Sequence, residues 1–91
     1  MQLLGDDAIA AALTSLRWER DGAELVKVVR RDDFASALAF VNEVGRLAEQ
    51  AGHHPDIEIR WNTVTLRLST HSLGGITDAD LSLARSIDAL G

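Results

Sequence analysis

The stretch from Glu49 to Asp80 holds the residue types best suited to chemistry, because it contains all three histidines, the only proline and three of the seven glycines. The histidines are His53, His54 and His71. An imidazole ordinarily titrates near neutral pH, so it can donate or accept a proton under the conditions in which most enzymes work. Carboxylates at both ends of the stretch could orient such a ring. We therefore expect an acid/base site here.

Two strands are predicted within this stretch, because apolar and polar residues alternate over 57–61 and again over 64–68. A two-residue loop at Asn62 and Thr63 would join them into a hairpin and keep the apolar side chains of both strands on one face. The expected cross-strand pairs are Trp61 with Val64, Ile59 with Leu66, Ile57 with Leu68 and, on the other face, Glu58 with Arg67.

The same register, extended to the strand ends, places His54 opposite His71. His53 would lie beside them, and Pro55 would fix the backbone that follows. Imidazoles that are far apart in sequence are therefore expected to converge at one end of the hairpin. From the first turn of the next helix, Asp80 could orient one of them.

Both nearby carboxylates also have structural explanations. Thr77 and Asp80 have the spacing of a capping box at the start of a helix, which is reason enough for the aspartate. Glu49 lies in the last turn of the helix before the histidines, where an anion opposes the helix dipole and needs compensation. Either residue could therefore serve the fold alone.

The histidines and a carboxylate could instead ligate zinc or iron. However, the chain has no HExxH spacing, and adjacent residues of an extended segment point to opposite sides. A single ion would therefore not easily be bound by both His53 and His54. The pattern favours proton exchange over metal binding.

The composition is that of one ordinary soluble domain spanning residues 1–91. Of the 91 residues, 46% are hydrophobic and 25% are charged. A net charge of -5 argues against nucleic-acid binding, which needs a basic surface. No apolar run is long enough to cross a membrane, and the N-terminus lacks a secretory signal, so we expect a cytoplasmic protein. The absence of cysteine excludes disulfides and thiol chemistry.

Three helices are predicted around the sheet. The first would be capped by Asp6 or Asp7 and would end near Ser15. The second would follow Asp32 and Asp33, end at Gly52, and bury the stripe Phe34, Leu38, Val41, Val44, Leu47 and Ala51. The last would begin at Thr77, end at Gly91, and bury Leu83, Ala84, Ile87 and Leu90.

A first hairpin precedes the long helix, because Asp21 and Gly22 are a typical turn pair and residues 25–29 read as the strand that follows. Trp18 at its start is expected in the core or as the wall of a site for a flat heteroaromatic ligand. The order is helix, two strands, helix, two strands, helix. The sequence therefore predicts an α+β fold, in which a single-layer four-stranded antiparallel sheet carries three helices on one face.

Motifs along nearly the whole chain resemble the pterin-4a-carbinolamine dehydratases, also known as the dimerisation cofactors of a hepatocyte homeodomain factor. The segments that carry the resemblance are Ala48-Glu49, His53-His54-Pro55, Trp61-Asn62-Thr63-Val64, Thr70-His71, Gly75-Ile76-Thr77, Asp80 and Leu83-Ala84-Arg85-Ser86-Ile87-Asp88, together with Trp18 and 34–41. Trp61 stands where tyrosine is common, and Arg31 where relatives often have an apolar or aromatic residue. Neither departure touches the expected catalytic residues.

The resemblance implies a lyase that removes water from 4a-hydroxytetrahydropterin and gives the quinonoid dihydropterin, as a step of tetrahydropterin recycling. It implies no metal or other cofactor, and a homodimer or homotetramer. By the same resemblance, His53 and His71 are the expected acid/base pair, His54 contacts the pterin, and Asp80 orients His71. The residues expected to line the pterin site are Trp18, Glu49, Pro55, Ser69 and Thr70.

A second hypothesis is a non-catalytic interaction protein on the same fold, because some relatives resemble assembly or transcriptional cofactors. The site residues discriminate between the two. A purely structural descendant has no reason to keep the histidine pair, His71 and Asp80 together, whereas this chain has them all. The sequence therefore favours the enzyme.

Overall fold

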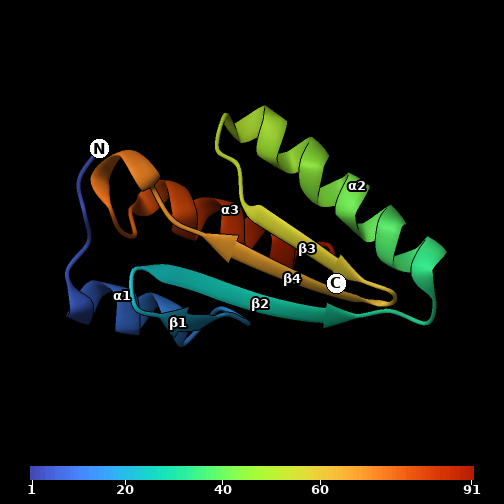
Figure 1. Ribbon diagram of the computed structural model, residues 1–91. Coiled ribbons are helices and arrows are strands. Elements are labelled where there is room, and N and C mark those ends of the chain that lie inside the picture. The colour runs from blue at the N-terminus through green and yellow to red at the C-terminus, as the bar shows by residue number, and fades with distance from the viewer.

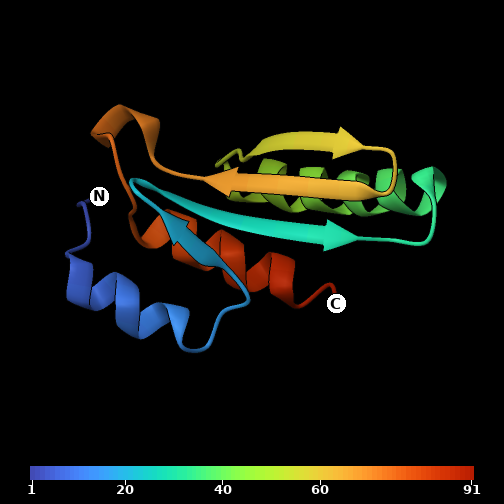
Figure 2. The same cartoon turned by 60° about the horizontal axis from the view of Figure 1, so that its bottom comes forward.

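The computed structural model describes residues 1–91 as three α-helices, four strands and one short 3₁₀ helix. Along the chain these are α1 (Asp6–Leu13), β1 (Glu19–Asp21), β2 (Glu24–Arg30), α2 (Phe34–Ala51), β3 (Asp56–Arg60), β4 (Thr63–Leu68), the 3₁₀ helix η1 (His71–Leu73) and α3 (Asp78–Asp88). The strands form one antiparallel sheet in the order β1-β2-β4-β3. The helices lie against one face of it (Figures 1 and 2), so the predicted fold class is confirmed.

The core lies between this sheet and the helices. Burial alternates along β4 as the sequence predicts, because Val64, Leu66 and Leu68 are fully covered while the residues between them are not. The buried residues that face them are Leu25 and Val29 of β2, Ala37, Phe40, Val44 and Ala48 of α2, and Leu81, Leu83, Ala84 and Ile87 of α3. The opposite face of the sheet carries no helix, and Val28 is 63% exposed there.

The second hairpin turns one residue earlier than predicted. Arg60 pairs with Thr63, so the loop consists of Trp61 and Asn62, and Trp61 has a φ of +49°. The Asn62 side-chain amide donates to the Arg31 carbonyl at 2.9 Å, and the Arg31 N–H donates to the Asn62 carbonyl at 2.9 Å. These two bonds tie the turn to the end of β2. Trp61, expected to pack on the core face, is 67% exposed at the hairpin tip.

The cross-strand register is consequently shifted by two residues. The observed pairs are Ile59 with Val64, Glu58 with Thr65, Ile57 with Leu66 and Asp56 with Arg67, so the predicted pairs are wrong. A shift of two keeps every side chain on its own face, because side chains alternate with a period of two. The apolar pattern therefore could not separate the two registers.

The long helix α2 has the predicted ends. The Asp33 side chain accepts from the Ser36 N–H at its start, and Gly52, with a φ of +62°, ends it in the left-handed conformation. Its buried face differs from the predicted stripe, because Phe34 and Leu38 are 46% and 42% exposed. The helix instead buries Ala37, Phe40, Val44 and Ala48, of which Val44 alone belongs to the predicted stripe.

The other helices show one further difference. The α1 helix has Gly5 at its N-cap and no side-chain cap, so Asp6 and Asp7 do not cap it but lie in its first turn, where they favour the helix dipole. By contrast, α3 begins with the predicted capping box of Thr77 and Asp80. None of the helices is both long and apolar enough to cross a membrane.

A partly buried carboxylate joins the C-terminal end of α3 to the first hairpin. Asp88 accepts from the Trp18 indole N–H at 2.9 Å, from Lys27 Nζ at 2.8 Å and from the Arg17 backbone N–H at 2.8 Å. Burial alone would raise the pKa of Asp88, but these hydrogen bonds together with the Lys27 charge hold that pKa below its usual value. The contact also explains why Trp18 is 5% exposed and Lys27 can face the core.

We expect Asp88→Asn to lower the free energy of unfolding by about 1–3 kcal/mol, because it leaves the covered Lys27 ammonium without a counter-charge. Urea denaturation at neutral pH measures this. Asp32→Asn is the matched control, since it removes an equal charge from an exposed residue with no ion pair. An equally stable Asp88→Asn protein would contradict the role given to this carboxylate.

The same contact makes the free energy of unfolding depend on pH in the acid range. Since the pKa of Asp88 is lowered in the folded state, its contribution is complete above the unfolded value of about 4 and is lost as the pH falls through the folded value. The unmutated protein should therefore lose more unfolding free energy on acidification than Asp88→Asn does.

Candidate active site

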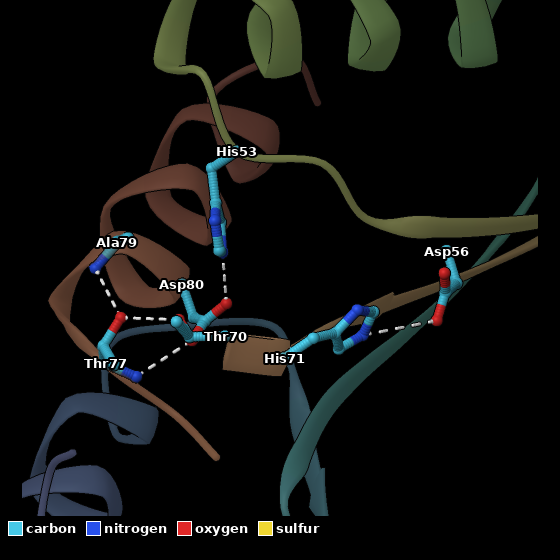
Figure 3. A network of polar contacts seen from close by, with 7 residues as sticks. All are labelled: His53, Asp56, Thr70, His71, Thr77, Ala79 and Asp80. Carbon is cyan, nitrogen blue, oxygen red and sulfur yellow. Dashed lines mark hydrogen bonds and ion pairs between the residues drawn. The ribbon is translucent and has the colours of Figure 1, made fainter. Parts of the chain in front are cut away.

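The end of α2 brings His53 to the start of α3. The left-handed Gly52 reverses the chain there, and the His53 N–H closes the helix by donating to the Ala48 carbonyl at 3.1 Å. The His53 side chain then reaches Asp80, with its Nε2 atom 2.5 Å from Asp80 Oδ1 (Figure 3). The imidazole is 16% exposed and the carboxylate is fully buried. With an ionised carboxylate as the acceptor, the proton of this bond is carried by Nε2.

The Asp80 carboxylate is held on its other side as well. Its Oδ2 atom accepts from the Thr70 hydroxyl and from the Thr77 backbone N–H, both at 2.9 Å. The Thr70 and Thr77 hydroxyls are 2.8 Å apart, and Thr77 caps α3 by accepting from the Ala79 N–H (Figure 3). Asp80 thus both caps α3 and orients an imidazole, so the structural and the functional explanation of this residue apply at the same time.

The predicted hydrogen bond between Asp80 and His71 is wrong. His71 begins η1 on the outer side of the loop, where its side chain is 68% exposed, and its Nε2 atom lies 3.9 Å from Asp56 Oδ2. The strand pairing ends before either histidine is reached, because β3 begins at Asp56 and β4 ends at Leu68. His54 is accordingly not opposite His71.

His54 has a carboxylate partner of its own. Its Nε2 atom is 2.5 Å from Glu49 Oε2, and the two side chains are 62% and 78% exposed. This contact supplies the compensation that an anion at a helix C-terminus needs. Glu49 is therefore tied to the histidine pair rather than left as a free helix end.

The remaining expected site residues divide into two groups. Ser69 and Thr70, 9% and 6% exposed, directly follow β4, and Pro55 is half-buried next to the histidine pair. Trp18 hydrogen bonds to Asp88 and has no polar contact with any histidine. Contact of any of these residues with a ligand stays a prediction.

Asp56 is the carboxylate that the sequence analysis missed. It directly follows Pro55 and opens β3, and its Oδ2 atom lies 3.9 Å from Nε2 of His71, which begins η1 beyond the end of β4. The available signal was an acidic residue immediately after the histidine pair and proline. The predicted strands instead extended as far as His54 and His71, whereas β3 begins at Asp56 and β4 ends at Leu68.

The three histidines thus have three different carboxylates: Asp80 for His53, Glu49 for His54 and Asp56 for His71. No group of three or more potential ligands among histidine, cysteine, aspartate and glutamate is arranged to hold a metal ion. A hollow of about 360 Å³ between α2 and α3 has His53 in its wall, together with Gln50 and Ser82. The arrangement suits proton exchange with a small ligand, because each imidazole has its own acceptor.

Comparison with known proteins agrees with this geometry. The sequence model described as pterin 4 alpha carbinolamine dehydratase matches residues 2–90. A protein of Nocardia farcinica named for that activity is 53% identical over 90 residues, which cover 98% of this chain and 95% of the relative. One of Acidobacterium capsulatum with the same name is 50% identical over 91 residues, covering 99% of both chains.

Solved structures show the same architecture. A transcriptional coactivator/pterin dehydratase from Brucella melitensis superposes with a TM-score of 0.92 at 28% identity, covering 98% of both chains. A pterin dehydratase-like protein identified as a RuBisCO assembly factor of the alpha-carboxysome gives a TM-score of 0.66 at 27% identity, covering 84% of this chain and 88% of that one. With its sequence matched from end to end and its fold shared, this chain belongs to the pterin-4a-carbinolamine dehydratase family of hydro-lyases.

Proposed function

We propose that this protein removes water from a 4a-hydroxytetrahydropterin by histidine general acid/base catalysis, and that it serves tetrahydropterin recycling. Family membership supports the reaction. The observation that carries the mechanism is the buried pair of His53 and Asp80, which holds one imidazole in a single orientation, whereas the other two imidazoles and their carboxylates are exposed.

The reaction needs two proton transfers. The hydroxyl on C4a leaves as water once an acid protonates its oxygen, and a base takes the proton of a ring N–H as the new C=N bond forms. An imidazole whose Nε2–H is held by a carboxylate offers Nδ1 to the substrate, and the carboxylate stabilises the ring when it becomes protonated. In this proposal His53 and His71 supply the two transfers, and His54 contacts the pterin.

We expect His53→Ala and His71→Ala each to lower the dehydration rate by ~10²–10⁴-fold, the usual contribution of a general acid or base. The double variant should be far less impaired than the product of the two effects, because the two rings act in one reaction. Stopped-flow turnover of the carbinolamine measures all three proteins. Full activity in a single variant with a native circular dichroism spectrum would remove that histidine from the mechanism.

Asp80→Asn should weaken both activity and stability, because an amide cannot accept from His53 on one side and from Thr70 and Thr77 on the other. We expect a smaller loss of rate than His53→Ala causes, since the imidazole remains, and a loss of about 1–3 kcal/mol in unfolding free energy.

Thr77→Ala is the matched control for Asp80→Asn, because it weakens the α3 cap without removing the contact between His53 and Asp80. It should lower the thermal midpoint while the rate per folded molecule stays near normal. A comparable fall in rate would show that the Asp80 effect is one of folding alone.

We also propose that the chain forms a homodimer or homotetramer. The short β1 strand pairs with β2 only as far as Val26, so the outer edge of β2 beyond it is open. Phe34 and Leu38 on α2 and Val28 on the uncovered sheet face are exposed apolar side chains. Open strand edges and exposed apolar groups are commonly covered by a second copy.

Multi-angle light scattering should therefore give a mass of two or four chains at micromolar concentration. Replacing Phe34 or Leu38 with serine should shift the mass toward one chain if α2 lies in the interface. A monomer alone at high micromolar concentration would count against the proposal.

A second function of a different class has one observation in its favour. The two similar structures are described as a transcriptional coactivator/pterin dehydratase and as a RuBisCO assembly factor, so this fold also serves proteins that assemble with others. The exposed apolar side chains of α2 would suit such a partner. Dehydration of the carbinolamine at an enzymatic rate would favour the lyase over this alternative.

A further inference from the structure

Asp56 is an acidic residue whose place in the fold is explained neither by capping nor by a cross-strand ion pair. It opens β3, and its backbone stands opposite Arg67 of β4. The Arg67 guanidinium, however, is bound by Asp21 at 3.1 Å and by Glu24 at 3.2 Å, on the first hairpin. The basic side chain that does lie within 4 Å of the Asp56 carboxylate is His71, at 3.9 Å (Figure 3).

Both side chains stand on constrained backbone. Asp56 follows Pro55, which restricts the chain before it, and it pairs into the sheet. His71 follows Thr70, whose N–H donates to the Gly75 carbonyl at 2.7 Å and whose carbonyl accepts from Leu73 and Gly74. The two anchor points are thus held in place while the side chains, 68% and 64% exposed, can still turn toward each other.

We propose that Asp56 is the positioning residue of His71. Resting on the proposed dehydratase function, the inference is that Asp56 accepts a hydrogen bond from His71 Nε2–H when substrate is bound, which leaves Nδ1 to exchange a proton with the pterin. The separation of 3.9 Å in the free protein fits this role, because catalytic hydrogen bonds are often long before the ligand arrives and then shorten. The role predicted for Asp80 toward His71 passes to Asp56.

Because the pair of Asp56 and His71 is exposed, its catalytic role can be tested apart from any effect on folding stability. An exposed ion pair contributes little to folding, whereas the same carboxylate decides which ring nitrogen carries the proton and where the ring points. The buried pair of His53 and Asp80 differs, since there the carboxylate also caps α3. Asp56 can therefore be changed without disturbing a helix end.

The test compares Asp56→Asn with Asp56→Glu in the dehydration assay. We expect Asp56→Asn to lower kcat on the order of tenfold with little change in KM, as part of the contribution of a general acid or base, and Asp56→Glu to recover part of the loss. Glu58→Gln is the matched control, because it removes an equal charge two residues along the same strand from a residue with no ion pair to a histidine. An equal fall in kcat for Glu58→Gln would overturn the proposal.

A double-mutant cycle provides the sharper test. In a His71→Gln background Asp56→Asn should cost nothing more, because its effect runs through the imidazole. A further tenfold loss in that background would show that Asp56 acts on the substrate or on the fold, and would overturn the proposal.

A measurement that needs no turnover keeps this inference distinct from the proposed reaction. The imidazole ¹⁵N chemical shifts of His71, recorded with a bound oxidised pterin such as 7,8-dihydrobiopterin, should respond to Asp56→Asn and not to Glu58→Gln. Unresponsive shifts would overturn the pairing even in an active enzyme. Responsive shifts in a protein without dehydratase activity would uphold the pairing and defeat the proposed function.

Discussion

The buried carboxylate of Asp80 is the interaction on which the site depends. It closes the N-terminus of α3, accepts a hydrogen bond from the hydroxyl of Thr70, which lies just beyond β4, and accepts another from the imidazole of His53, which lies just beyond α2. Three elements that are distant in the chain are therefore joined at one charged group. A buried charge of this kind is tolerated only when its oxygens are fully hydrogen bonded, as they are here.

The three pairs of histidine and carboxylate differ in how firmly they are held. The side chain of Asp80 is fully buried and that of His53 is largely buried, whereas those of His54 and His71 and of their carboxylate partners are exposed. One imidazole is thus fixed by folding, and the other two are free to adjust to a ligand. This division fits a reaction with two proton transfers, in which one group is preorganised and another follows the substrate.

Much of this could be predicted from the sequence, because the helix ends at Asp33, Gly52 and Thr77 and the alternation along β4 are local signals. The hairpin register could not be predicted, and neither could the pairing of histidines with carboxylates, because His53 and His54 lie in the loop after α2 and His71 lies in η1, where no periodic pattern places a side chain. A shift of two residues satisfies the same apolar pattern, and the left-handed Trp61 that decides it carries no glycine or asparagine signal. The sequence likewise could not predict which apolar residues of α2 are exposed, because periodicity does not say which side of a broad apolar stripe meets the sheet.

The central claim is that this protein accelerates loss of water from a 4a-carbinolamine through its histidines. The most direct measurement generates the carbinolamine enzymatically with an aromatic amino-acid hydroxylase and follows formation of the quinonoid dihydropterin with and without this protein. We predict an acceleration proportional to protein concentration that exceeds the effect of an equal concentration of free imidazole. A rate indistinguishable from the uncatalysed dehydration, for natively folded protein across pH 6–9, would contradict the account.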